Sequence, residues 1–365
     1  MKRLVVCSDG TWNEPDQTDR GERCPSNVVI TDRAVAPQDS KGVPQVSFYD
    51  RGVGTAWGLD KLVGGAFGTG LSRNVEDGYR FLVDNHGPDD DSLFLFGFSR
   101  GAYTVRSLVG LIRKCGLLKK RHVEKFPEAY ALYRNGKVGP DAPEAMRFRN
   151  DFSRPVRIRF LGVWDTVGAL GVPGMMGFLS RYHQFHDVTL SRSVERAYQA
   201  VAIDERRRWF QPAIWEAQDH PGQIVEQVWF AGVHTNIGGG YADRGLSNIT
   251  FLWMKQKAEE AGLAFDEDYI RSVIHPDSLG ELRDSRKGIY RATPDYVRAI
   301  GVHKRGHEWV HPSVFDRIRR KMPRYAPENV GDWMVRAGLT IDDQPPEPVR
   351  VATAAAGGED YEEVG

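Results

Sequence analysis

The sequence predicts an α/β fold with a mostly parallel central sheet flanked by helices, and three features carry that prediction. Short, continuous apolar runs recur along the chain, as is typical of strands that are buried on both faces of a parallel sheet. Each run ends in a short polar or glycine-rich stretch, where a strand would stop. Helical patterns separate the runs, and alternation of strand and helix gives a parallel sheet. Ligands collect at the carboxyl ends of such strands, so functional residues are expected in the stretches that follow them.

Five apolar runs are predicted to be strands, at residues 3–7, 44–49, 92–96, 156–164 and 226–233. Helices are predicted at residues 74–85, 102–116 and 251–262. The second of these has apolar residues three and four positions apart, which places them on one helix face. Residues 199–215 are predicted to be a helix end followed by a buried aromatic cluster, with the charges of 204–208 in an ion-pair network.

The chain is predicted to form a single large domain over residues 1–345. Two stretches, about 115–152 and 170–190, are expected to be helical or loop-like cap insertions that leave the sheet. Residues 265–345 mix charge, proline and aromatic residues without a clear period, so they are assigned only to an irregular helical region. Residues 346–365 are predicted to be a flexible acidic tail.

Composition excludes several classes of function. The 365 residues include 49 basic and 49 acidic side chains, so no overall field would attract nucleic acid. Cys7, Cys24 and Cys115 are an odd number without zinc-type spacing, which argues against a disulfide framework and for a reducing compartment. No cofactor and no metal are predicted.

The first apolar run, from Leu4 to Cys7, is too short for a signal peptide or a membrane span. No other run reaches the roughly 18 apolar residues that a spanning helix needs. A cytoplasmic protein without a cleaved signal is therefore predicted, with peripheral membrane contact and delivery by a secretion machine both left open. The oligomeric state is also left open.

The stretch Gly97-Phe-Ser-Arg-Gly101 lies where a predicted strand meets a predicted helix. A G-x-S-x-G motif in that context forms a tight turn that exposes the serine, and its two glycines leave room for neighbouring chain. The sequence therefore predicts Ser99 as a catalytic nucleophile. The alternative is a glycine-rich turn with a solvated serine.

A serine nucleophile needs a histidine base, and the histidine needs a carboxylate to orient it. In α/β-hydrolases the order along the chain is serine, acid, histidine. Asp165 ends one predicted strand and His234 ends the next, so they are the predicted acid and base. The alternatives are that Asp165 is an N-cap or turn aspartate and that His234 caps a turn or binds a structural carboxylate. His311 is the reserve base, and His183 and His186 are weaker candidates.

Three backbone N–H groups are candidates for an oxyanion hole, those of Arg100, Gly10 and Thr11. Arg100 follows the serine, whereas Gly10 and Thr11 follow the first strand and are assigned by position alone. The glycine-rich stretches 50–55 and 64–70 lack the spacing of a dinucleotide or P-loop motif, so they are predicted to be loops at the rim of the site.

The segment from 170 to 179 is apolar but interrupted by glycine and proline. Such flexible, methionine-containing surface adapts to varied apolar ligands. One hypothesis is a lid or acyl-binding wall over Ser99, and the other is a loop packed on the core. The candidate substrate-binding residues are Met175, Met176 and Phe178.

Six stretches, in this order, resemble the catalytic-domain family of type VI secretion lipase effectors: SDGTWN, YDRGVGT, GFSRGAYTVR, FLGVWDTVG, AIDERRRWFQP and WFAGVHTNIGGGY. The resemblance covers about residues 2–254, with HPSV near His311 as a further match. It implies an α/β-hydrolase fold, ester hydrolysis, phospholipid substrates in the effector members, and a triad that maps onto Ser99, Asp165 and His234.

One position departs from the family. Where members commonly have aspartate two residues after the histidine, this chain has Asn236, which keeps hydrogen bonding and loses the charge. The predicted function is hydrolysis of carboxylic esters by a serine hydrolase, with lipid esters first and small soluble esters as an alternative. Two other classes remain as hypotheses: a non-catalytic binding module on the same scaffold, and a nucleotide- or phosphate-handling protein.

Overall fold

A computed structural model describes residues 1–10, 13–52, 66–87, 91–167, 190–216, 220–303, 307–321, 324–340 and 348–350. The predicted α/β fold is confirmed. An eight-stranded sheet runs through the described residues in the order β12-β11-β10-β9-β8-β5-β1-β4. Neighbouring strands pair in parallel, except that β12 is antiparallel to β11. From one edge to the other the strands are β12 (Val349–Arg350), β11 (Glu308–Val310), β10 (Ile224–Phe230), β9 (Arg196–Ala202), β8 (Ile158–Trp164), β5 (Ser92–Phe98), β1 (Arg3–Ser8) and β4 (Gln45–Asp50).

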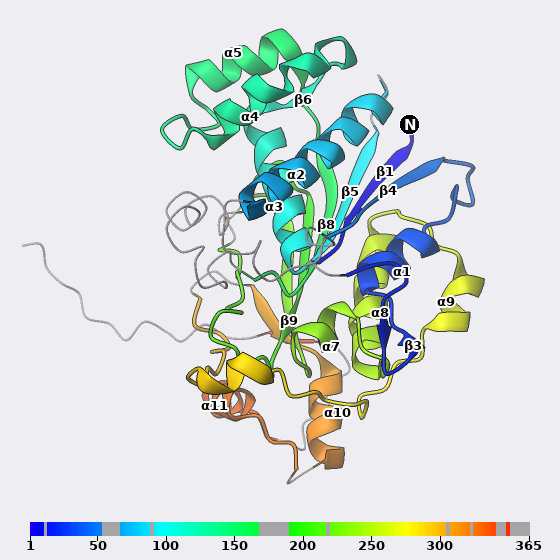
Figure 1. Ribbon diagram of the computed structural model, residues 1–365, viewed down its shortest axis with the longest axis vertical. Coiled ribbons are helices and arrows are strands. Elements are labelled where there is room, and N and C mark those ends of the chain that lie inside the picture. Colours follow the sequence, from blue (N-terminus) through cyan, green and yellow to red (C-terminus); the bar gives the residue numbers. More distant parts are fainter. Residues whose placement is uncertain are drawn as a thin grey trace, which may run out of the picture.

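Helices cover both faces of the sheet (Figure 1). They are α1 (Asn27–Ala34), α2 (Ala66–Asn85), α3 (Arg100–Cys115), α4 (Phe126–Arg134), α5 (Pro143–Phe152), α7 (His234–Gly238), α8 (Gly245–Glu260), α9 (Glu267–Val273), α10 (Pro312–Lys321) and α11 (Glu328–Ala337). Short 3₁₀ helices span Lys120–Lys125 and Gly288–Ala292, and two small hairpins pair β2 (Thr18–Asp19) with β3 (Glu22–Arg23) and β6 (Leu117–Leu118) with β7 (Ser153–Arg154).

Alternation along the strands divides the core between the two faces, because successive side chains of a strand point in opposite directions. On β1, Leu4 and Val6 pack with α2 and α3, whereas Val5 and Cys7 pack with α1 and α8. A third cluster joins β9, β10 and β11 to α10 and α11. Burial on both faces explains why the central strands are continuous apolar runs in the sequence.

The prediction of a helix end at residue 199 is wrong, because Arg196–Ala202 forms strand β9. Alanine and glutamine favour helix in isolation, but intrinsic preference is a weak effect that tertiary context overrides. Here β9 lies between β8 and β10 and pairs with both, and six of its seven residues are buried.

The ion-pair network predicted for the charges at 204–208 is confirmed, since Arg207 pairs with Glu205 and Arg206 pairs with Asp295.

Two other predictions concern the rim of the site. Residues 66–70 of the expected rim loop 64–70 belong to helix α2. The excursion at 115–152 is helical, but it contacts the far end of α3 from Ser99, where Cys115 Sγ lies 3.1 Å from the carbonyl of Ala129. At a rise of about 1.5 Å per residue, the contacts of this insertion with Gly110 and Cys115 lie roughly 16 to 24 Å along α3 from Ser99, and a cap over Ser99 stays a prediction.

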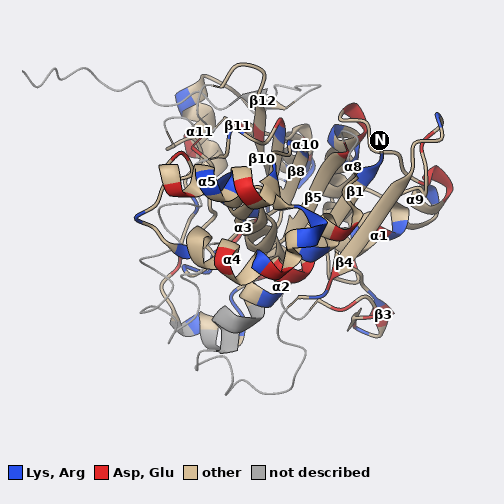
Figure 2. Ribbon diagram, turned by 90° about the horizontal axis from the view of Figure 1, so that it is seen from above, with Lys and Arg blue, Asp and Glu red and all other residues tan. Residues whose placement is uncertain are grey.

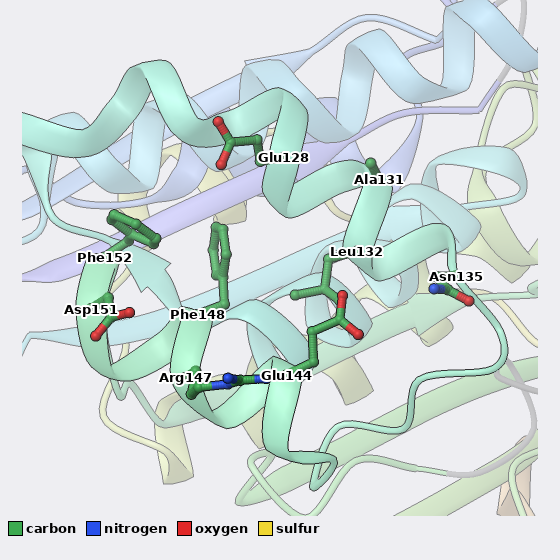
Figure 3. A pocket seen from close by; sticks show the side chains of 9 residues that line it. All are labelled: Glu128, Ala131, Leu132, Asn135, Glu144, Arg147, Phe148, Asp151 and Phe152. Atoms are coloured by element: carbon green, nitrogen blue, oxygen red, sulfur yellow. The ribbon is translucent and has the colours of Figure 1, made fainter.

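Helices α4 and α5 enclose a groove of about 580 Å³ at that far end (Figure 3). Its apolar lining includes Leu132, Phe148 and Phe152, and charged side chains such as Glu128 and Glu144 lie at its edge. Acidic and basic residues are mixed along α2 and α5 when the molecule is viewed from above (Figure 2). None of the helices in the described residues combines the length and the apolar character required to cross a membrane.

Candidate active site

Ser99 lies in the turn between β5 and α3, with the backbone angles φ 56° and ψ −117°. A non-glycine residue rarely adopts a positive φ, and such strain is found mostly at functional sites. Two glycines make the turn feasible. A Cβ on Gly97 would lie 2.6 Å from the backbone of Ala102, and a Cβ on Gly101 would lie 2.0 Å from the carbonyl oxygen of Ser8. The turn therefore packs directly on the end of β1.

The side chains of Ser99, His234 and Asp165 form one hydrogen-bonded chain. His234 Nε2 lies 2.8 Å from Ser99 Oγ, and His234 Nδ1 lies 2.6 Å from Asp165 Oδ2. Asp165 directly follows β8, and His234 begins α7 four residues after the end of β10. Parallel strands bring these ends to one edge of the sheet, although the residues are 135 and 69 positions apart in sequence.

His234 is buried and held between two aromatic rings. Its ring centroid lies 4.7 Å from that of Phe98 and 5.1 Å from that of Phe210. Its backbone N–H donates to Glu205 Oε2 at 3.2 Å. Burial lowers the pKa of His234, and the hydrogen bond and charge of Asp165 oppose this without reversing it. A neutral imidazole at neutral pH is the form that can accept a proton from Ser99.

Asp165 is fully buried, with a φ of 40°. Its Oδ1 accepts from the backbone N–H of Ala202 at 2.9 Å and from Nη1 of Arg298 at 2.6 Å. Its Oδ2, which also contacts His234, accepts from Nη2 of Arg298 at 3.0 Å. Burial raises the pKa of Asp165, but the charge of Arg298 and the hydrogen bonds outweigh it and hold the pKa below its usual value. Asp165 is therefore a carboxylate.

A second buried carboxylate, Asp9, organises the loop after β1. Its Oδ1 accepts from the N–H of Gly10 at 2.7 Å and from Nδ2 of Asn13 at 2.9 Å. Its Oδ2 accepts from the hydroxyls of Ser26 at 2.6 Å and Tyr49 at 2.9 Å. Burial raises the pKa of Asp9, and these four donors oppose the rise.

One of the three oxyanion-hole candidates, the N–H of Gly10, is already hydrogen-bonded to Asp9. Gly10 lies against the nucleophile, since a Cβ on it would be 3.2 Å from Ser99 Cβ, but its N–H is already directed at Asp9. Thr11 lies outside the described residues. Arg100 opens α3 directly after Ser99, and it stays the predicted oxyanion-hole donor.

In the described residues, neither His311 nor Asn236 joins the hydrogen-bonded chain. Nδ1 of His311 lies 2.8 Å from Ser313 Oγ, and its ring stacks on Phe230. Asn236 accepts from the N–H of Val233 and donates to the carbonyl of Glu281, so it joins α7 to the segment beyond α9. The residues that lie outside the described part of the chain are His183, His186, Met175, Met176 and Phe178. Among the described residues no group of three or more potential ligands could hold a metal ion.

Sequence reasoning missed three residues of this site: Arg298, Glu205 and Asp9. Arg298 belongs to the stretch without a clear period, where no pattern singles it out. Glu205 was assigned only to an ion-pair network, yet it also accepts from the backbone of His234. Asp9 had a usable signal, because it follows a predicted strand at the same edge as the other candidates.

A sequence model of the family "T6SS, Phospholipase effector Tle1-like, catalytic domain" matches residues 2–257. The chain belongs to this family. The expected resemblance is therefore confirmed, and residues 258–365 lie beyond the matched part.

Individual relatives are distant and longer. An uncharacterized protein of Saccharomyces cerevisiae, YEL023C, is 28% identical over 232 residues, which cover 57% of this chain and 32% of that protein. A crystal structure of an uncharacterized protein from Pseudomonas aeruginosa aligns with a TM-score of 0.43 at 19% identity, covering 73% of this chain and 47% of the other. A structure of the Tle1 effector bound to the VgrG spike from the type 6 secretion system aligns with a TM-score of 0.39 at 21% identity, covering 67% and 52%. The chain thus spans about a third to a half of these proteins.

Proposed function

We propose that this protein is a serine hydrolase that cleaves carboxylic esters, with lipid esters, phospholipids among them, as its main substrates. The observation that carries the proposal is the hydrogen-bonded chain from Ser99 through His234 to Asp165, with distances of 2.8 and 2.6 Å. It has the order and contacts of a nucleophile, a base and an orienting acid. Membership of a family named for phospholipase effectors supports the lipid substrates.

The reaction would begin when Nε2 of neutral His234 takes the proton of the Ser99 hydroxyl as Oγ attacks the ester carbonyl carbon. The carbonyl oxygen becomes an oxyanion, for which the N–H of Arg100 is the proposed first donor. Collapse of this intermediate expels the alcohol, which takes the proton from Nε2 and leaves an acyl group on Ser99. A water molecule, deprotonated by the same nitrogen, then releases the acid.

Asp165 would stabilise the imidazolium that forms during each proton transfer. Its hydrogen bond to Nδ1 fixes the tautomer in which Nε2 is free to accept a proton. The strained turn at Ser99 supports this assignment, because a residue that served only as a solvated turn would not need a positive φ held by packing against β1.

Fluorophosphonate labelling tests the proposal, because the probe reacts only with an activated serine. We expect the wild type to be labelled and Ser99→Ala to be unlabelled. Ser313→Ala is the matched control, because Ser313 is the serine that contacts the reserve histidine His311. It should be labelled like the wild type. A folded wild type that is neither labelled nor active on any ester would leave the binding-module hypothesis in place of this one.

The substrate class is tested with p-nitrophenyl esters from acetate to palmitate and with phospholipid vesicles. A rise in kcat/KM with acyl length, together with release of fatty acid from vesicles, is expected for a lipase. Highest activity on acetate with none on vesicles would instead identify an esterase for small soluble esters.

A further inference from the structure

Arg298 is an arginine whose side chain is completely buried, beside an equally buried Asp165. Its guanidinium meets the carboxylate with both terminal nitrogens, Nη1 to Oδ1 at 2.6 Å and Nη2 to Oδ2 at 3.0 Å. Nη1 also donates to the carbonyl of Ala202 at 2.9 Å, and Nη2 donates to the carbonyl of Phe210. This two-point contact fixes the plane of the carboxylate as well as its charge.

The backbone around Arg298 is itself held in place. Asn329, on α11, donates its side-chain amide to the carbonyl oxygens of Arg298 at 2.9 Å and Ile203 at 3.1 Å. Asn329 is buried. The segment after residue 257, beyond the match to the family, therefore delivers one positive charge to Asp165 and anchors it.

Moving a guanidinium out of water costs free energy of solvation, which the hydrogen bonds and charge of a partner must offset. The effect of Arg298 on the charges of Asp165 and His234 is therefore considered next. With His234 neutral, Asp165 and Arg298 together carry no net charge. When His234 accepts a proton, the three groups carry a charge of plus one. Arg298 thus opposes protonation of the pair formed by His234 and Asp165, while its hydrogen bonds orient the carboxylate.

We propose that Arg298 is a positioning residue for the ester hydrolysis proposed above. It keeps Asp165 ionised and aligned with His234, and it keeps His234 unprotonated in mildly acidic solution. This inference rests on the proposed function, since it concerns the efficiency of the same three residues.

Other charged groups lie near His234 and Asp165, and the charge of Arg207 also lowers the pKa of His234; Arg207 pairs with Glu205, however, whereas Arg298 pairs with Asp165. Glu205 lies on the backbone side of His234 and is neutralised by Arg207, whose guanidinium lies over the rings of Phe210 and Tyr290. Asp9 lies on the other side of Ser99 and accepts four hydrogen bonds. Asp204 accepts from the N–H of Gly232 and the hydroxyl of Tyr325. Arg100 directly follows the nucleophile.

Two substitutions separate charge from geometry. Arg298→Gln removes the charge, so the pair should take up a proton more readily, and the acid limb of kcat/KM should move to higher pH by about one unit or more. Below that limb its kcat/KM would be roughly tenfold lower than that of the wild type. Arg298→Lys keeps the charge but loses the fork, so its acid limb should stay near that of the wild type while kcat falls and KM changes little.

Arg317→Gln is the matched control, because Arg317 is buried in the same segment but donates to the carbonyls of Ser278 and Gly280 instead of a carboxylate. Its acid limb should not move. Active-site titration with the fluorophosphonate gives the concentration of active enzyme in each preparation. Because kcat is calculated from that concentration, misfolded molecules do not lower it.

The titration of His234, followed by NMR in protein labelled at histidine, gives a readout that needs no turnover. Arg298→Gln should raise the pH at which His234 is protonated. If neither this pH nor the acid limb moves in Arg298→Gln, the positioning role is overturned, even if the variant is unstable. Failure of the wild type to be labelled or to turn over any ester would instead overturn the proposed function, and the NMR titration would still test Arg298.

Discussion

Two parts of the chain contribute to the candidate site in different ways. Residues 2–257, which match the family, contain Ser99, Asp165 and His234, each at the end of a strand or the start of a helix. The described residues from 258 to 340 contain none of these three groups but supply Arg298, which is buried against Asp165. The comparison indicates that the groups proposed to react come from one segment, whereas the charge that balances them comes from the other.

The largest expected effect lies wholly within the first segment. His234→Ala removes the proposed base and should lower kcat by roughly 10⁴-fold or more, because the serine would no longer lose its proton in the transition state. His311→Ala is the matched control in the second segment, where the ring stacks on Phe230 and contacts Ser313. Its kcat should stay within a few-fold of the wild type, as measured on p-nitrophenyl esters. A larger loss in His311→Ala than in His234→Ala would reverse the assignment of the base.

The next effect measures the link between the two segments. Asp165→Asn and Arg298→Met each leave one buried charge without its partner, so each should lower the free energy of unfolding by about 3–5 kcal/mol. The double variant removes both charges and should cost less than the sum, with a coupling of about 1–3 kcal/mol. Urea unfolding, monitored by tryptophan fluorescence, gives the change in the free energy of unfolding for each single variant and for the double variant.

A control cycle uses the ion pair of Arg113 and Asp141 within the first segment, whose side chains are 19% and 57% exposed. Its coupling should be about 0–1 kcal/mol, as expected for a surface ion pair. If the Asp165 and Arg298 variants prove additive, the two segments are not linked through this contact, and the comparison drawn above loses its energetic basis.

A smaller effect tests the turn at Ser99. In Gly101→Ala the new Cβ would overlap the carbonyl of Ser8, which is backbone and cannot rotate away. We expect a loss of about 1–3 kcal/mol in the free energy of unfolding and slower fluorophosphonate labelling, because the turn must shift away from β1.

Gly78→Ala, in the middle of α2, is the control for that change. A Cβ there would make ordinary contacts of 3.5 and 3.6 Å with Leu108 and Val6. Because alanine favours helix over glycine by about 1 kcal/mol, this variant should be at least as stable as the wild type. Equal stability of the two variants would show that the turn does not depend on its contact with β1.

How much of this molecule could be predicted from its sequence follows from the kind of signal that each part carries. Strands buried on both faces, such as Leu93 to Phe96, are continuous apolar runs, and the polar residue after each run marks the site edge. Strand β9 was missed because its alanines and glutamine carry no strand preference, and its neighbours in the sheet determine it. Arg298 was missed because it lies 133 positions from Asp165, and a contact of that range leaves no local pattern. The lid proposed at Met175 and Met176 stays a prediction.

The smallest expected effect concerns the helices α4 and α5, which belong to the family-matched segment but pack at the far end of α3. Glu144→Gln, at the edge of their groove (Figure 3), should change the free energy of unfolding by no more than about 0.5 kcal/mol, because Glu144 is exposed. Its kcat/KM on p-nitrophenyl esters should equal that of the wild type, since Glu144 lies near Lys114, roughly 22 Å along α3 from Ser99. The informative comparison is with Arg298→Lys, a charge-conserving substitution in the segment outside the family match, which should still lower kcat.

If Glu144→Gln instead reduced activity on phospholipid vesicles but not on soluble esters, the insertion would contact the lipid surface. Distance from Ser99 would then no longer separate the parts of the molecule that matter for catalysis from those that do not.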